Sequence, residues 1–318
     1  MLYLHGMFST SLSRALAIAL ATVLMFGLVF LREATSPSGA GYWTAMAAAP
    51  NGDLYIADET RRELRLIHAS GGWERLAAAP PGIFRALAAD GPNLLLATEG
   101  KLFVSGDTGA HWRAALPGRF TAVSIQGADE LAGAWSDALY VSHDTGQTWT
   151  KATVPLGDTQ FEALIPGVAA TLLGLLQSTD SGRTWTRVPG LPDRMTALDR
   201  GSREAADWRG HVWAQETFQN GLPSRLAPGS GPGVEPIVVP GARWYQLQTM
   251  PGGVWSLAKS VVATTQGIYV KGKPVGGPLK GREVTRIVLS DLTYWAVAAR
   301  GPVYVSPNGT DWRLAYQG

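Results

Sequence analysis

A short motif with the pattern S-x-D-x-G-x-x-W recurs along this chain and constrains its fold more than any other feature. Three full copies begin at Ser105, Ser142 and Ser178, which places them 37 and 36 residues apart. A shortened copy begins at Ser306 and a worn copy at Ser70. Repetition at a period of about 40 residues is typical of folds in which one supersecondary unit stacks on the next. The residues of the full and shortened copies, called the box residues below, are Ser105, Asp107, Gly109, Trp112, Ser142, Asp144, Gly146, Trp149, Ser178, Asp180, Gly182, Trp185, Ser306, Asn308, Gly309 and Trp312.

A second register of apolar residues supports the same period. Each of them opens a short run of alternating apolar and polar residues, and further runs of this kind complete four strands per unit. Four-stranded units at a period of about 40 residues predict an all-β chain, a seven-bladed β-propeller of antiparallel blades over residues 42–318. The 38 glycines and 20 prolines fit the many turns of such a fold. The predicted strand openings are Trp43, Phe84, Phe120, Phe161, Met195, Trp244 and Val284.

The repeated motif resembles the Asp-box, or BNR repeat, of sialidases, sortilin-type receptors and the photosystem II assembly-factor propellers. In such a turn the aspartate accepts backbone N–H bonds, the glycine adopts a positive φ, and the tryptophan covers the edge of the blade. We therefore expect the box residues to be structural. The fifth and sixth units depart from the pattern, since glycine-rich stretches at 228–231 and 271–273 stand where boxes are expected.

The N-terminal segment predicts a membrane anchor. Seventeen uncharged residues, 15–31, lie between Arg14 and Arg32, and a helix of that length spans about 25 Å. The free amine and Arg14 favour a cytoplasmic N-terminus, 1–14, with the linker 32–41 and the propeller on the periplasmic, extracytoplasmic or lumenal side. The alternative is a cleaved signal peptide, for which Ser38 to Ala40 offer a small-residue cleavage site.

Composition excludes several classes of function. Of the 27 basic residues, Arg14 and Arg32 belong to the N-terminal segment, which leaves 25 against 25 acidic residues and no basic stripe for nucleic acid. The chain has no cysteine, so thiolate chemistry is excluded. The five histidines show no metal-ligand spacing. We expect neither a metal nor a cofactor.

The family resemblance implies that the box turns lie on one face and that the opposite face binds. Alignment of the strand openings puts arginines at the start of innermost strands, and further residues in the loops between second and third strands. Guanidinium groups suit carboxylate or phosphate groups of a partner, because they form bidentate hydrogen bonds. The alternative is ordinary surface charge paired with Glu162, Glu283 and Asp137. The candidate partner-binding residues are Arg61, Arg62, Arg85, Arg119, Arg194, Arg243, Phe218 and Arg300.

These observations favour a binding protein over an enzyme. The resemblance to sialidases would require an arginine triad, a tyrosine with a glutamate partner and an acid/base aspartate, and the sequence offers plausible candidates only for the arginines. We expect a non-catalytic, membrane-anchored scaffold that docks on and helps to assemble a membrane protein complex, in line with the assembly-factor resemblance, for example a photosynthetic or other energy-converting one. The alternatives are a carbohydrate- or peptide-binding receptor module and a sialidase-like glycoside hydrolase. Four tryptophans are not assigned to the repeat: Trp208, Trp213, Trp255 and Trp295.

Overall fold

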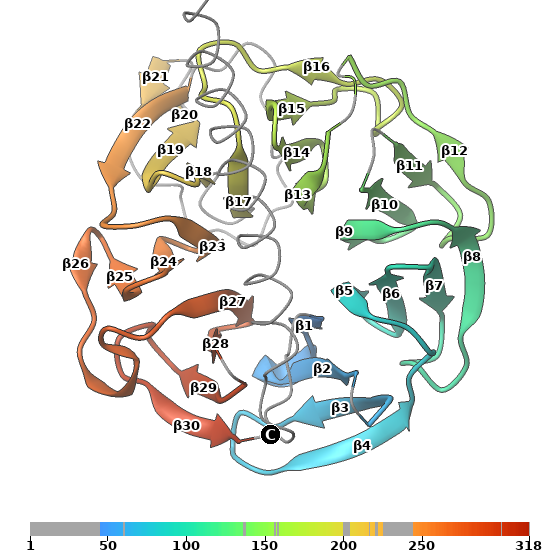
Figure 1. The fold of residues 1–318 in the computed structure, drawn as a ribbon, viewed down its shortest axis with the longest axis horizontal. Coiled ribbons are helices and arrows are strands. Elements are labelled where there is room, and N and C mark those ends of the chain that lie inside the picture. The colour runs from blue at the N-terminus through green and yellow to red at the C-terminus, as the bar shows by residue number, and fades with distance from the viewer. Residues whose placement is uncertain are drawn as a thin grey trace, which may run out of the picture. The chain divides into compact units, whose positions relative to one another are not determined.

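The structure, a computed structural model, describes residues 45–317 except for 60, 136–137, 156, 158, 200–203, 216, 220–221, 225–243 and 300. Seven four-stranded antiparallel sheets are arranged around a central channel in the order of the sequence (Figure 1). Apart from the sheets, the described residues form a two-stranded hairpin and two short 3-10 turns, η1 (Pro50–Gly52) and η2 (Gly277–Leu279). The predicted all-β, seven-bladed propeller is confirmed.

The first three blades each use four consecutive strands, from the channel outward. Blade 1 has β1 (Met46–Ala48), β2 (Leu54–Asp58), β3 (Glu63–Ile67) and β4 (Trp73–Ala78); blade 2 has β5 (Phe84–Asp90), β6 (Asn93–Thr98), β7 (Lys101–Ser105) and β8 (Arg113–Pro117); blade 3 has β9 (Phe120–Gln126), β10 (Asp129–Ala134), β11 (Leu139–Ser142) and β12 (Thr150–Lys151).

The remaining blades follow the same rule with one exception, because blade 5 carries a hairpin, β20–β21, between its third and outermost strands. Blade 4 has β13 (Phe161–Ile165), β14 (Val168–Thr171), β15 (Gly174–Gln177) and β16 (Thr186–Arg187); blade 5 has β17 (Met195–Asp199), β18 (Glu204–Asp207), β19 (His211–Gln215), β20 (Thr217–Gln219), β21 (Leu222–Ser224) and β22 (Trp244–Thr249); blade 6 has β23 (Val254–Ala258), β24 (Val261–Thr264), β25 (Gly267–Val270) and β26 (Lys273–Pro274); blade 7 has β27 (Val284–Ser290), β28 (Thr293–Ala298), β29 (Val303–Ser306) and β30 (Arg313–Tyr316).

Five of the seven predicted strand openings are the first residues of innermost strands: Phe84, Phe120, Phe161, Met195 and Val284. Trp43 lies outside the described residues, and the first innermost strand is described from Met46. The prediction for Trp244 is wrong, because β22 pairs with β19 as the outermost strand of blade 5. The innermost strand of blade 6 begins at Val254.

The residues that open the innermost strands hold neighbouring blades together. Phe84, Phe120 and Phe161 are each at most 1 % exposed. A Cβ placed on Gly133, in β10, would lie 2.5 Å from the Cβ of Phe161, so this glycine makes room for the phenylalanine of the next blade. Full burial of such a side chain contributes roughly 1.5–3 kcal/mol.

The box turns have the hydrogen bonds expected of them. In the third blade the Ser142 hydroxyl lies 2.8 Å from Asp144 Oδ1 and accepts a bond from the N–H of Gly146 at 2.9 Å. Thr148 donates to Asp144 from both its hydroxyl and its N–H, and these bonds lower the pKa of Asp144 to about 2. Gly146 has a φ of 72°. The same arrangement recurs around Asp107, Asp180 and Asn308.

Each box turn also packs on the blade before it. A Cβ on Gly146 would lie 2.8 Å from the Cγ2 of Val104, in blade 2, and 2.5 Å from Oε2 of Glu130. A Cβ on Gly309 would lie 2.7 Å from the Cγ2 of Val261, in blade 6. The box glycines are therefore needed both for their positive φ and for close contact between blades.

The ring closes through side chains rather than through a shared strand, because blades 1 and 7 are each built from their own segment. Trp295, in β28, is fully buried, and its Nε1 donates to the carbonyl of Gly52 in η1 at 2.8 Å. The Ser290 hydroxyl donates to the carbonyl of Ala49. An apolar cluster that includes Met46 and Tyr316 fills the junction.

The predicted membrane anchor, 15–31, lies outside the described residues, as do its flanking segments 1–14 and 32–41. Within the part of the chain that the structure describes, no helix reaches the length and apolarity of a membrane span.

We expect Trp295→Phe to lower the free energy of unfolding by about 2–4 kcal/mol, because it leaves the Gly52 carbonyl without its donor and opens space at the ring closure. Urea denaturation of the purified protein measures this. Trp255→Phe is the matched control, since Trp255 is 45 % exposed, and we expect a change below about 1 kcal/mol. Equal effects of the two substitutions would contradict the closing role of Trp295.

Candidate functional site

The second residue of nearly every innermost strand occupies a β-bulge. The pairing register shifts between the first and third residues of β5, β13, β17, β23 and β27. In blade 3, Phe120 and Ala122 of β9 pair with adjacent residues of β10, so the same shift occurs there. A bulge re-aims the side chain of the extra residue, and bulges are common beside functional sites. The bulged residues are Arg85, Thr121, Glu162, Thr196, Trp255 and Thr285.

These strands enclose a cavity of about 170 Å³ in the central channel, lined by the innermost strands of blades 2 to 7. Its hydroxyl groups join neighbouring blades. Thr121 donates to the carbonyl of Phe161 at 2.7 Å, and Thr196 donates to the carbonyl of Val254 at 2.7 Å. Ser256 donates to the carbonyl of Ile287 at 3.2 Å. The hydroxyls of the wall are therefore engaged in holding the ring.

Two charged side chains, Glu162 and Arg286, also line the channel cavity. Burial raises the pKa of Glu162, and the charge of Arg194 partly offsets this. Burial lowers the pKa of Arg286. Both shifts have the sign that desolvation of a charged group produces.

A charged cluster lies where β5 and β9 begin. Arg119 Nη2 lies 2.9 Å from Glu99 Oε1, and the guanidinium of Arg85 contacts the same oxygen. The structure thus brings two of the predicted arginines together on one carboxylate. The guanidinium carbon of Arg119 also lies 3.7 Å from the ring centre of Trp135.

The same arrangement of arginine and tryptophan recurs in blade 5. The guanidinium carbons of Arg194 and Arg209 lie 5.2 and 5.3 Å from the ring centre of Trp208. In both blades the backbone fixes the pair, since the N–H of Trp135 donates to the carbonyl of Arg119 and that of Trp208 to the carbonyl of Arg194. Trp135 and Trp208 are 43 % and 44 % exposed. The set formed by Arg85, Glu99, Arg119, Trp135, Arg194, Trp208 and Arg209 is called the rim below.

The tryptophans of the rim were not among the predicted site residues. Trp135 and Trp208 directly follow the second strands of their blades, β10 and β18. Arg119 and Arg194 directly precede the innermost strands, β9 and β17. A comparison of these two positions in each unit would have found the pairs from the sequence.

Arg61 and Arg62 lie in the turn between β2 and β3, as predicted. Arg61 Nη1 lies 3.0 Å from Oδ2 of Asp58, a fully buried carboxylate. Arg62 has a φ of 53°. The Arg61 side chain therefore serves in part to neutralise a buried charge.

The described structure does not place three other predicted residues beside the rim. Arg243 and Arg300 lie outside the described residues, although Trp244, the next residue after Arg243, begins an outermost rather than an innermost strand. Phe218 lies in β20, which follows the third strand of blade 5, so the expectation that it belongs to a loop between second and third strands is wrong. The physical reason is the insertion in blade 5, which displaces every later feature of that unit.

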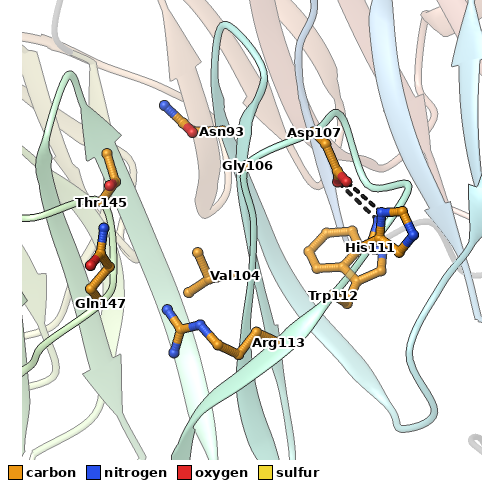
Figure 2. Close-up of a pocket in the computed structure, with 9 residues that line it drawn as sticks. All are labelled: Asn93, Val104, Gly106, Asp107, His111, Trp112, Arg113, Thr145 and Gln147. Atoms are coloured by element: carbon orange, nitrogen blue, oxygen red, sulfur yellow. Dashed lines mark hydrogen bonds and ion pairs between the residues drawn. The ribbon is translucent and has the colours of Figure 1, made fainter.

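A second, open cavity of about 390 Å³ lies between the box turns of blades 2 and 3 (Figure 2). In this view Asp107 and His111 face each other, and Thr145 and Gln147 lie opposite them on blade 3. The N–H of His111 donates to Asp107 Oδ1 at 2.9 Å, and this bond, together with those from the His111 ring and the Ser105 hydroxyl, lowers the pKa of Asp107 to about 2. The Asp107 carboxylate is thus occupied by hydrogen bonds within its own turn. Because its pKa is low, it is poorly suited to proton transfer.

Glu130, in β10, is fully buried beneath the box turn of blade 3. Within the described part of the chain neither of its carboxylate oxygens has a hydrogen-bond partner. Burial raises the pKa of Glu130 to about 7; the charge of Asp144 adds to this, and that of Arg113 opposes it. At alkaline pH this carboxyl is therefore ionised while it is buried, which destabilises the folded protein.

Over the ranges that the structure describes, no three His, Asp or Glu side chains come together in a way that could hold a metal ion.

No family model matches this chain, and no curated protein matches it. Among solved structures, it is similar to the extracellular domain of the putative one component system BT4673 from B. thetaiotaomicron, with a TM-score of 0.59 and 12 % identity over 85 % of this chain and 39 % of that one. It spans well under two thirds of that relative. The computationally designed Ika8 protein matches with a TM-score of 0.54 and 12 % identity over 89 % of both chains. YCF48 from Cyanidioschyzon merolae matches with a TM-score of 0.45 and 13 % identity over 88 % of both chains. The first two matches, with TM-scores above 0.5, support the fold alone.

We expect Glu130→Gln to stabilise the protein at alkaline pH. Because the pKa of Glu130 rises from 4.5 on folding to about 7, the folded state binds more protons between these values, and stability falls as pH rises through that window. The variant lacks this fall, so at pH 8 its free energy of unfolding should exceed that of the parent by about 2 kcal/mol, after a discount for solvent screening. Urea denaturation of both proteins at pH 4.5 to 8 measures the difference.

Asp291→Asn is the matched control, because Asp291 is exposed in the turn between β27 and β28. We expect its difference from the parent to stay constant with pH. A constant difference for Glu130→Gln as well would show that Glu130 titrates normally.

Proposed function

We propose that this chain is a non-catalytic binding propeller that docks on a protein partner through the rim. The observation that carries the proposal is the stacking of arginine on half-exposed tryptophan at two places of the same face, Arg119 on Trp135 and Arg194 on Trp208. Tryptophan and arginine are the residues most enriched among those that dominate binding energy at protein interfaces. Stacking holds each guanidinium in place while its outer edge can still bond a carboxylate.

The charge of the rim favours an acidic partner. The rim has four arginines and one carboxylate, Glu99, which already contacts Arg85 and Arg119. Arg194 also acts on the nearby carboxyl of Glu162. Arginine forks form bidentate bonds with carboxylates, and complementary charge accelerates association. We infer that the rim recognises an exposed acidic segment of its partner.

The proposal includes a membrane setting, which rests on the predicted anchor at 15–31. A propeller held by such an anchor on the extracytoplasmic side would meet membrane protein complexes at high effective concentration. A role as a scaffold or assembly factor for such a complex, photosynthetic or otherwise energy-converting, follows from this arrangement.

The alternative of a glycoside hydrolase has less support. Such enzymes use two carboxyl groups about 5–9.5 Å apart, and of the described residues that line the channel cavity only Glu162 carries a carboxyl. The rim arginines Arg85 and Arg119 converge on Glu99 rather than on an open pocket.

The alternative of a carbohydrate-binding module rests on Trp255, which is 45 % exposed and lines the channel cavity. An aromatic face can stack on the apolar face of a sugar. Binding on a glycan array that is lost in Trp255→Ala and retained in Arg119→Ala would favour this alternative over docking.

We expect the double variant Arg119→Ala, Arg194→Ala to lose its partner. The tagged full-length protein is cross-linked in its native membranes, extracted in mild detergent, and its bound proteins are quantified by mass spectrometry. Loss of two interface arginines should reduce the recovery of a stoichiometric partner by roughly 10- to 100-fold. Raised salt before cross-linking should act in the same direction.

Arg187→Ala is the matched control, because Arg187 lies on the outermost strand β16 and pairs with Asp193. It should retain the partner, and both variants should keep the thermal midpoint of the parent. A partner recovered equally by the double variant and the control would refute docking through the rim.

A further inference from the structure

One innermost strand carries a charged residue where the others carry a small one, and the proposed docking through the rim does not involve this residue. The third residue of these strands is small in blades 2 to 6 and is Arg286 in blade 7. This layer therefore contains one guanidinium among small neighbours. The small residues are Ala86, Ala122, Ala163, Ala197 and Ser256.

Arg286 lines the channel cavity, together with residues of the other five innermost strands. Within the described part of the chain it forms no hydrogen bond or ion pair, although burial lowers its pKa. Arg286 is partly exposed to the cavity, so its guanidinium can pair with an anionic ligand that enters the cavity. A guanidinium in a cavity is best suited to a carboxylate or another planar anion.

A carboxylate lies on the other side of the same cavity. The blades follow the sequence order around the ring, so blade 4, with Glu162, stands nearly opposite blade 7, with Arg286; Figure 1 shows β13 and β27 on opposite walls. Glu162 occupies the bulge of β13 and, among the described residues, forms no hydrogen bond or ion pair. Its pKa is raised by burial and lowered by the charge of Arg194.

The hydroxyl groups of the wall are not competitors for a ligand, because Thr121, Thr196 and Ser256 already donate to carbonyls of neighbouring blades. The apolar side of Trp255 completes the lining. The cavity thus offers one cationic group, one anionic group on the opposite wall, and apolar surface between them.

We propose that the channel binds a small linear zwitterion, whose carboxylate pairs with Arg286 and whose ammonium pairs with Glu162, with its carbon chain against Trp255. The volume of about 170 Å³ is below the roughly 300–1,000 Å³ of pockets for drug-sized ligands, so the ligand is the size of an amino acid or a short peptide with free ends. This site goes beyond the docking function of the rim and does not depend on it.

The test uses isothermal titration of the purified full-length protein with three probes of one chain length: 6-aminohexanoate, hexanoate and hexylamine. We expect saturable binding of 6-aminohexanoate with a Kd below about 1 mM. Hexanoate and hexylamine each leave one buried charge unpaired, and each should bind at least about 10-fold more weakly. Triglycine, a zwitterion with free peptide ends, should compete with 6-aminohexanoate.

The variants Arg286→Met and Glu162→Gln keep the approximate size of each side chain and remove its charge. Each should weaken 6-aminohexanoate binding by at least about 10-fold, while Arg286→Lys should retain part of it. The matched controls are Arg187→Met and Glu74→Gln, whose side chains are 46 % and 55 % exposed. Thermal midpoints of the unliganded variants show whether each remains folded.

Three results would overturn the proposal. The first is no saturable binding of either zwitterion, and the second is binding that survives in both channel variants. The third is equal affinity for 6-aminohexanoate and hexanoate, which would leave Glu162 without the proposed role.

Discussion

The structure depends on the burial of both faces of every sheet by its neighbours. No blade can cover itself, so the apolar residues that open the innermost strands are protected only when the preceding blade is present. Phe84, Phe120 and Phe161 are buried in this way, and the box turns add contacts from each blade to the one before it. At the junction between blades 7 and 1, the buried Trp295 joins the two blades and donates a hydrogen bond to the carbonyl of Gly52. The closed ring in turn creates the channel, because seven sheets leave an axis that their innermost strands cannot fill.

Periodicity predicted most of this fold, because strand openings and box turns repeat with the blades. The prediction failed at Trp244, where the unit is lengthened by an insertion and a box is missing, so neither register marked the boundary. At the rim, the sequence indicated Arg119 and Arg194 but not their tryptophans. Stacking joins residues 14 to 16 positions apart, so the sequence reveals these pairs only when the first two strands of each unit are also paired with each other.

The charged groups of the described propeller fall into two environments with different physics. At the rim, arginines lie on half-exposed rings near water, where a guanidinium keeps part of its hydration and a partner can exchange readily. In the channel, Glu162 and Arg286 are partly buried, and burial shifts the pKa of each toward its neutral form. The first environment favours contact with a large surface, and the second favours capture of a small molecule that supplies both missing charges.

The closure of the ring by side chains alone has a consequence for the chain's ancestry and engineering. Because each blade is complete within its own segment, the junction between blades 7 and 1 needs no covalent connection and is held by contacts such as the bond from Trp295 to Gly52. The starting blade is therefore arbitrary: a peptide joining β30 to β1, with a new opening in any other loop between blades, would give a circular permutant with the same set of contacts. A gene built in this way can also gain or lose whole blades by duplication or deletion, since no strand is shared across the break.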